Sequence, residues 1–308
     1  MTYRPLRLLA LSLIVALGLV AAPAHRPAHA AVRRAAITVV DDRGTTVALP
    51  ARPRRIISLA PNVTEILFSL DLGSEVVGVS SFSDYPAAAK RLPIVINYTS
   101  VNIEKILALK PDLLVAAAIV PASAIAKLRA LHLPVLVTDP TDLPGILKDI
   151  RLVGTATGVS VAATVEVSVL QRRIDGVKAL VSHTAARPRV FYELDPKQLY
   201  TGGHGSFIDS LITLAGGVNV AGTINNPYPA LSAEKLIASD PQYIILGDYN
   251  YGVTAASVAA RPGFGSISAV KQRHVYGIND DLVSRPGPRI VDGLDKIAEL
   301  IHPGLVIH

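Results

Sequence analysis

Two glutamates occupy matching positions in a repeated segment of the chain. Residues 104–115 (EKILALKPDLLV) align without gaps to residues 234–245 (EKLIASDPQYII), 130 residues further on. Each copy places a glutamate, Glu104 or Glu234, in the first turn of an expected helix, which ends before a proline and leads into an apolar run. Acids in this position are stabilised by the helix dipole by about 0.3–1 kcal/mol, so a purely structural role explains the pattern. Two equivalent carboxylates would also suit a partner of approximate twofold symmetry with basic pockets, because arginine pairs bidentately with carboxylate.

Three tyrosines lie in expected loops, one after a strand-like run and the other two before the helices of the repeated glutamates. They are Tyr85 in SDYP, Tyr98 in INYTS and Tyr228 in NNPYPALS. A tyrosine ring packs on a planar apolar ligand while its hydroxyl bonds a polar edge, so the three together suit a ligand of that kind. A half-exposed loop aromatic with no ligand is an equally good explanation of any one of them.

The remaining motifs argue against metal chemistry and catalysis. His204, in the glycine-rich segment TGGHGS, is the histidine best placed for a cleft, but a loop histidine near a helix start is more often solvated. The sequence has no HExxH, no Walker A motif, and no GxSxG or GxGxxG in a strand–turn–helix context. It has no cysteine, which excludes disulfides, thiolate metal sites and a cysteine nucleophile. We therefore expect no catalytic residues, no metal site and no resident cofactor.

The first thirty residues have the pattern of an export signal. Arg4 and Arg7 precede an apolar run, 8–22, and a stretch that ends in Ala28-His29-Ala30. The run is shorter than the roughly 20 residues of a membrane span and is followed by small residues at a cleavage pattern, so residues 1–30 are predicted to be a signal peptide cleaved near Ala30. An uncleaved anchor is the alternative. Without a cysteine for lipid attachment, we expect a periplasmic protein.

The composition of the predicted mature chain fits two lobes and no nucleic acid. Removal of thirty residues, which carry three arginines and no acid, leaves 278 residues with a net charge of about +3 instead of +6. No basic run accompanies that excess, so nucleic-acid binding is not indicated. We predict an N-terminal α/β lobe over 31–157, a connecting helix over 158–186 and a C-terminal α/β lobe over 187–308.

Alternating short apolar runs and helical patterns support the two α/β lobes. A hairpin is predicted from 37–40 and 45–49, around a turn at Gly44. Asn62 is predicted to cap the first helix, with Glu65 three residues later. The predicted strands are 55–59, 76–80, 112–118, 134–138, 189–194, 242–247 and 274–278. The predicted helices are 62–72, 102–109, 121–131, 143–157, 206–215 and 289–301.

One long helix is predicted between the lobes. Its apolar positions recur at spacings of four and three residues, which describes a single buried stripe. The stripe consists of Ala163, Val167, Leu170, Ile174, Val177 and Val181. A coiled coil would need more heptads, so we expect a single connecting helix with the ligand cleft between the lobes that it joins.

Four segments resemble the substrate-binding proteins of ABC importers for cobalamin, iron-siderophores and haem. They are 80–86 (SSFSDYP), 102–116 (NIEKILALKPDLLVA), 201–220 (TGGHGSFIDSLITLAGGVNV) and 284–290 (SRPGPRI). The resemblance implies two α/β lobes joined by a long helix. It also implies that Glu104 and Glu234 dock onto arginines of a dimeric permease, whose separate ATPase subunits hydrolyse ATP. The chain itself would then be a monomeric, non-enzymatic binding protein.

The cobalamin-binding members of that family provide the expected ligand site. By resemblance to them, Tyr85, Tyr98 and Tyr228 stand at aromatic pocket positions, and Leu194 replaces a phenylalanine. Asp281 and Arg285 match a polar pair that contacts corrin side chains, although a surface ion pair of little energetic value would look the same. A corrinoid is therefore the expected ligand. Haem and ferric siderophores are the alternatives within the class, and a tetrapyrrole chelatase-like enzyme is the alternative outside it.

Overall fold

A computed structural model of the chain describes residues 1–2, 36–97, 100–184 and 187–307. Two predictions fall outside these ranges: nearly all of the signal peptide and the loop tyrosine Tyr98. Among the described residues, no helix combines the length and the apolar character needed to cross a membrane.

The N-terminal lobe is built on a six-stranded sheet. Its strand order is β6-β5-β4-β3-β7-β8, and every neighbouring pair is parallel except β5 with β6. The strands are β3 (Ile56–Ser58), β4 (Val76–Ser80), β5 (Ile94–Asn97), β6 (Ser100–Val101), β7 (Leu113–Ala117) and β8 (Val135–Thr138). Strands β7 and β8 are buried at every position, as expected for parallel strands that are covered on both faces.

Helices and one hairpin complete this lobe. The predicted hairpin is confirmed as antiparallel strands β1 (Ile37–Val40) and β2 (Thr46–Leu49). The helices are α1 (Pro61–Ser69), α2 (Ile103–Ala108), α3 (Ala122–Ala130) and α4 (Leu143–Ala156), with a short 3₁₀ turn, η1 (Ala89–Arg91).

The predicted cap of the first helix is wrong. Helix α1 begins at Pro61 after Ala60, and no side chain caps it. Proline fits the first helical position because its φ is preset and it lacks an N–H that would need a partner. Asn62 therefore lies inside the helix, and its side-chain amide donates to the carbonyl of Pro286 in the other lobe.

The C-terminal lobe is built on a four-stranded parallel sheet. Its order is β10-β9-β11-β12, with β9 (Arg189–Glu193), β10 (Val218–Asn219), β11 (Tyr243–Leu246) and β12 (Val275–Gly277). Its helices are α6 (Phe207–Leu214), α7 (Ala233–Ser239), α8 (Ala255–Ala259), α9 (Ser268–Lys271), α10 (Asp281–Ser284) and α11 (Ile290–Ile301). Two 3₁₀ turns, η2 (Gly247–Tyr251) and η3 (Phe264–Ser266), follow β11 and α8.

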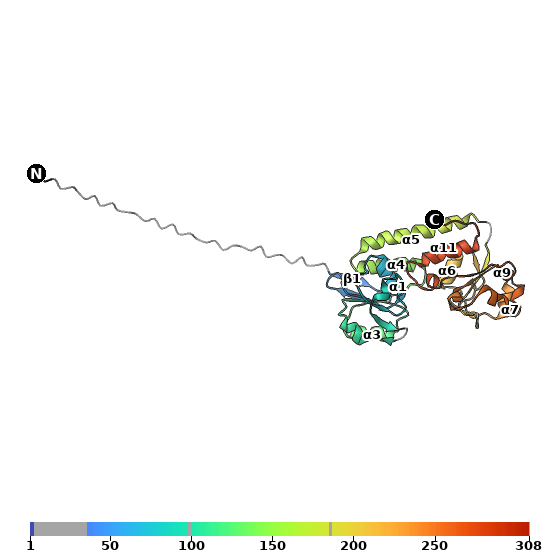
Figure 1. Cartoon of the computed structure of the whole chain (residues 1–308), viewed down its shortest axis with the longest axis horizontal. Coiled ribbons are helices and arrows are strands. Elements are labelled where there is room, and N and C mark those ends of the chain that lie inside the picture. Colours follow the sequence, from blue (N-terminus) through green and yellow to red (C-terminus); the bar gives the residue numbers. More distant parts are fainter. Residues whose placement is uncertain (3–35, 98–99, 185–186, 308) are drawn as a thin grey trace. The chain divides into compact units, whose positions relative to one another are not determined.

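Helix α5 (Ser160–Ser182) connects the lobes and packs on α4 and α11 (Figure 1). Its buried residues are the six of the predicted stripe. They join one continuous apolar cluster that reaches β7 in the first lobe and β9 in the second. The connecting helix therefore shares a core with both lobes.

Candidate functional site

A cavity of about 400 Å³ lies between the two lobes. From the N-terminal lobe it is lined by residues that end or follow β3, β4 and β7, including Leu59, Phe82 and Ile119. The C-terminal lobe contributes Asp281 and Arg285 from the region of α10. Ligands of α/β proteins bind beyond the carboxyl ends of parallel strands, and the volume is in the range of small-molecule pockets.

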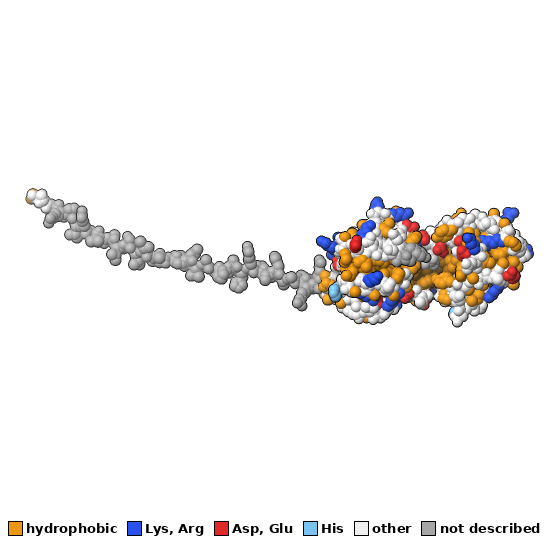
Figure 2. Space-filling model, turned by 90° about the horizontal axis from the view of Figure 1, so that it is seen from below, with side chains coloured by type: hydrophobic (Ala, Val, Ile, Leu, Met, Phe, Trp, Pro, Cys, Tyr) orange, Lys and Arg blue, Asp and Glu red, His pale blue; other side chains and the backbone are white. Residues whose placement is uncertain are grey.

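Much of the lining is apolar and exposed to solvent. Phe82 is 52 % exposed, Ile119 70 % and Tyr251 85 %. Figure 2 shows hydrophobic side chains between the two lobes on one face of the molecule. Grouped exposed apolar side chains mark interaction surfaces, and these three face the cavity from both lobes. The cleft is therefore suited to a ligand with large apolar faces.

The polar side of the cleft is an ion-pair network centred on Arg285. One terminal guanidinium nitrogen of Arg285 lies 2.7 Å from Asp281. The other lies 2.6 Å from Asp84 and 3.3 Å from Glu65, both of which belong to the opposite lobe. Burial raises the pKa of Asp281, and the positive charge of Arg285 opposes that shift. The expected polar pair therefore exists, but its arginine also joins the lobes.

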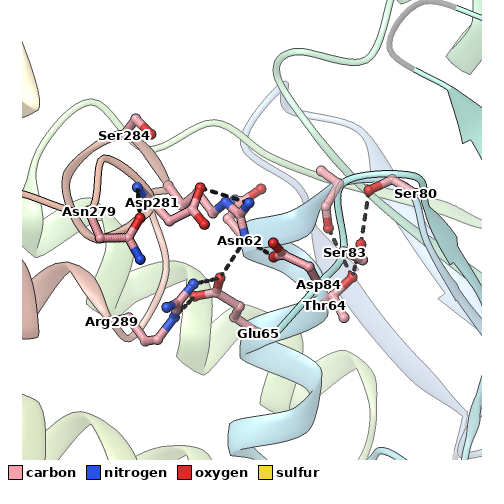
Figure 3. A network of polar contacts seen from close by, with 12 residues as sticks. Asn62, Thr64, Glu65, Ser80, Ser83, Asp84, Asn279, Asp281, Ser284 and Arg289 are labelled. Carbon is pink, nitrogen blue, oxygen red and sulfur yellow. Dashed lines mark hydrogen bonds and ion pairs between the residues drawn. The ribbon is translucent and has the colours of Figure 1, made fainter. Parts of the chain in front are cut away.

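Arg289 extends the same network behind the cleft (Figure 3). It donates to both carboxylate oxygens of Glu65, at 3.0 and 2.6 Å. The Tyr85 ring lies over the Arg289 guanidinium, 4.0 Å from centroid to Cζ, as in a cation–π contact. These residues line a neighbouring cavity of about 310 Å³.

The structure brings together some of the predicted pocket residues and separates others. Asp281 and Arg285 share the cleft, whereas Tyr85 lines the neighbouring cavity. Tyr228 is 54 % exposed, and burial of its hydroxyl, followed by the negative charge of nearby Asp280, raises its pKa. Leu194 packs against the main apolar cluster. Ligand contacts of these side chains, and of Tyr98, remain predictions.

The two repeated glutamates lie in equivalent surroundings. Glu104 and Glu234 are each the second residue of a short helix, α2 or α7, and both are exposed. The caps correspond as well: Asn102 accepts a hydrogen bond from the third helical N–H at 2.9 Å, and Ser232 does so at 3.2 Å. Hydrogen bonds from its own N–H and from the Ser232 hydroxyl lower the pKa of Glu234, so that it stays ionised.

An arginine fixes the far end of each of these helices. Arg55, just before β3, donates to the carbonyl of Leu109 through two nitrogens, at 2.9 and 2.7 Å. Arg189, at the start of β9, donates in the same way to the carbonyl of Asp240, at 3.0 and 2.7 Å. Cations at helix C-termini satisfy free carbonyls and complement the dipole. Each exposed glutamate is thus carried by a helix that is held at both ends.

No metal centre is formed by the residues that the structure describes. Among them, no group of three or more histidine, aspartate or glutamate side chains could hold a metal ion. His204 is exposed, and its Nδ1 lies 3.8 Å from Asp209.

Two classes of residue, one in the cleft and one behind it, were not recognised from the sequence. Phe82 and Tyr251 line the cavity, but each was one loop aromatic among several. Glu65 and Arg289 tie the lobes together, but Glu65 was assigned only to a helix start. The segment SSFSDYP was the one signal that could have indicated Phe82.

The sequence is similar to that of known substrate-binding proteins. The sequence profile described as "Periplasmic binding protein" matches residues 56–282. A vitamin B12-binding protein of Vibrio cholerae serotype O1 is 32 % identical over 268 residues, which cover 86 % of this chain and 95 % of that protein. An ABC transporter substrate-binding lipoprotein of Bacillus subtilis is 32 % identical over 274 residues, covering 87 % and 86 %.

Solved structures agree with this relationship. The crystal structure of the periplasmic vitamin B12 binding protein of Vibrio cholerae has a TM-score of 0.71 at 31 % identity and covers 81 % of this chain and 97 % of its own. A periplasmic heme-binding protein from Roseiflexus has a TM-score of 0.73 at 27 % identity and covers 80 % and 97 %. These relatives are named as binding proteins, not as enzymes. With its two-lobed fold and its interlobe cleft, the chain belongs to the periplasmic binding protein family.

Proposed function

We propose that this protein binds a corrinoid ligand in the interlobe cleft and delivers it to an ABC importer. The observation that carries the proposal is the cleft itself, in which exposed apolar side chains from both lobes face the paired Asp281 and Arg285. Apolar lining with a few convergent polar groups is typical of small-molecule sites. The similarity to vitamin B12-binding and cobalamin-binding proteins supports a corrinoid as the ligand.

Delivery to the permease would use the two repeated glutamates. Glu104 and Glu234 occupy the same helical position in the two lobes, and both are free to meet a partner surface. A dimeric permease with one arginine pocket per subunit matches this pair, because each carboxylate accepts a bidentate guanidinium. In this proposal the chain acts as a monomer without enzymatic activity, and ATP is hydrolysed on other chains.

The place of action in the proposal is the periplasm, after cleavage of residues 1–30. Mass spectrometry of the protein secreted by its host would test this part. A mature N-terminus near residue 31 is expected, and an intact Arg4–Arg7 segment would contradict the proposal.

Calorimetric titration of the purified mature protein with cyanocobalamin tests the ligand class. Saturable one-to-one binding is expected. A heme-binding relative of similar fold makes haem the second candidate, so haemin and a ferric siderophore should be titrated in parallel. Binding of one of these without cyanocobalamin would keep the transport role and refute the corrinoid.

Two sets of variants separate the ligand site from the docking site. Glu104→Ala with Glu234→Ala is expected to keep the ligand affinity while impairing stimulation of the reconstituted importer, because both side chains are exposed and outside the cleft lining. Loss of ligand binding in this double variant would refute the docking role. Conversely, Tyr98→Ala and Tyr228→Ala should each weaken ligand binding. Unchanged ligand affinity in both variants would show that these tyrosines do not line the ligand site.

A further inference from the structure

The arginine that lines the cleft and the arginine behind it are both already paired with carboxylates. Among the described residues that line the interlobe cavity, Arg285 is the only lysine, arginine or histidine. Its guanidinium contacts three carboxylates, those of Glu65, Asp84 and Asp281. The neighbouring Arg289 is bound through two nitrogens to Glu65. A ligand that enters the cleft therefore meets no uncompensated positive charge on these two arginines.

The balance of this cluster is acidic. The guanidinium groups of Arg285 and Arg289 face three carboxylates, which belong to Glu65, Asp84 and Asp281. Asp280 adds a fourth acid to the cavity lining. An anionic ligand would approach this cluster against a net negative charge. In a partly desolvated cleft, two charges several ångströms apart interact more strongly than they do in bulk water. The net charge of the cluster therefore affects which ligands bind.

The net charge of this cluster depends most on Glu65. It is 3 % exposed, and it is the carboxylate shared by both arginines. The side chain of Asp84, by contrast, is 47 % exposed, so solvent screens its charge. A buried carboxylate needs paired cations, and Glu65 is paired with the guanidinium groups of both Arg285 and Arg289, which come from the other lobe. Figure 3 shows the pair of Glu65 and Arg289.

We propose that Glu65 is a specificity-determining residue: by neutralising and positioning Arg285 and Arg289, it makes the cleft reject ligands with negative charge and accept neutral or cationic ones. Glu65 acts through the arginines and need not touch the ligand. This inference rests on the proposed function, since it assumes that the ligand binds in the interlobe cleft.

The test is Glu65→Gln, which keeps the size of the side chain and removes its charge. The parent and the variant are titrated with cyanocobalamin, with haemin, whose two propionates are anionic, and with haemin dimethyl ester, in which those charges are blocked. The ratio of haemin to cyanocobalamin affinity should rise by roughly tenfold in the variant, and the gain should shrink with added salt. The dimethyl ester should show no comparable gain.

Two further variants act as controls. Glu299→Gln changes the net charge by the same amount at an exposed position in the last turn of α11, at the opposite end of that helix from Arg289, and should leave the ratio unchanged. Asp84→Asn removes a more exposed partner of Arg285 and should raise the ratio in the same direction by a smaller factor. It provides the test if Glu65→Gln does not fold.

The outcomes distinguish this inference from the proposed function. A parent protein that binds none of the probes refutes the proposed function. A parent that binds cyanocobalamin, together with variants whose haemin ratio is unchanged, refutes the role of Glu65 alone. An equal gain for haemin and for its dimethyl ester also refutes it, because a loosened cleft rather than charge would then explain the gain.

Discussion

A buried carboxyl pair in the N-terminal lobe should make the stability of this protein depend on pH. Asp149, on α4, is 1 % exposed and lies beside Asp42, which forms an ion pair with Lys148 at 2.6 Å. Burial first, and then contact with the Asp42 carboxyl, raises the pKa of Asp149 to about 8. Burial also tends to raise the pKa of Asp42, but its contacts with Asp149 and Lys148 outweigh burial and lower that pKa. Asp149 is therefore protonated in the folded protein at neutral pH.

The direction and size of the effect follow from linkage. In the unfolded chain Asp149 ionises near pH 4, whereas in the folded protein it holds its proton to about pH 8. Its contribution to stability is thus fully present below pH 4 and is lost as the pH rises toward 8, with a slope that approaches about 1.4 kcal/mol per pH unit. Asp149→Asn removes this slope. The variant should match the parent near pH 4 and exceed its stability at pH 7 by up to about 4 kcal/mol.

Urea denaturation of the mature protein, followed by circular dichroism between pH 4.5 and 8, measures this difference. Asp175→Asn is the matched control, because Asp175 lies exposed on α5, where it accepts a hydrogen bond from Gln171 at 3.0 Å and lies 3.8 Å from Lys178. The control should follow the parent at every pH. If the parent and Asp149→Asn show parallel pH profiles, or if the variant is the less stable at pH 7, the assignment of a buried protonated carboxyl is wrong.

Three further predictions concern packing and helix α7, which carries Glu234. Gly154→Ala would place a methyl group 2.3 Å from the Cβ of Ala163 on α5, so it should destabilise the protein by about 1–3 kcal/mol in a thermal or urea unfolding assay. Ile174→Ala removes a buried residue of the α5 stripe and should cost about 2–5 kcal/mol, whereas the exposed Val165→Ala on the same helix should stay within about 0.5 kcal/mol. Arg189→Met removes the donors to the C-terminal carbonyls of α7, so amide hydrogen exchange should accelerate in that helix while the ligand affinity is unchanged.

Much of the fold could be predicted from the sequence because the deciding patterns are local. The stripe of α5 was complete in the spacing of its apolar residues, and burial confirms all six positions. The run 76–80 became β4 with the same bounds. Short edge segments were missed, among them β6 and β10 with two residues each, because two residues carry no periodicity.

The interlobe contacts could not be predicted because they join residues far apart in sequence. Asp281 is the first residue of α10 and Arg285 is its C-cap, four residues later, so their pairing is a local pattern. Glu65 and Arg289 are separated by 224 residues, and only the packing of the two lobes brings them together. In sequence Glu65 looked like an ordinary acid near a helix start. Its burial gives it a different role, because a buried carboxylate needs paired cations.

The repeated helices show where local prediction reaches its limit. Glu104 and Glu234 align because each lies in an uninterrupted helix–strand segment in which cap, helix and proline keep their spacing. The arginines that hold the other end of each helix lie at the start of an earlier strand: Arg55 directly precedes β3, and Arg189 is the first residue of β9. The stretch of chain between the arginine and the repeated segment differs in length between the two lobes. The equivalence of the two arginines is visible only in the bonds that they make. Both lobes retain this arrangement although the sequences between its parts differ, so a rigid presentation of the two carboxylates is a common structural property of the two lobes, as docking onto a twofold partner would require.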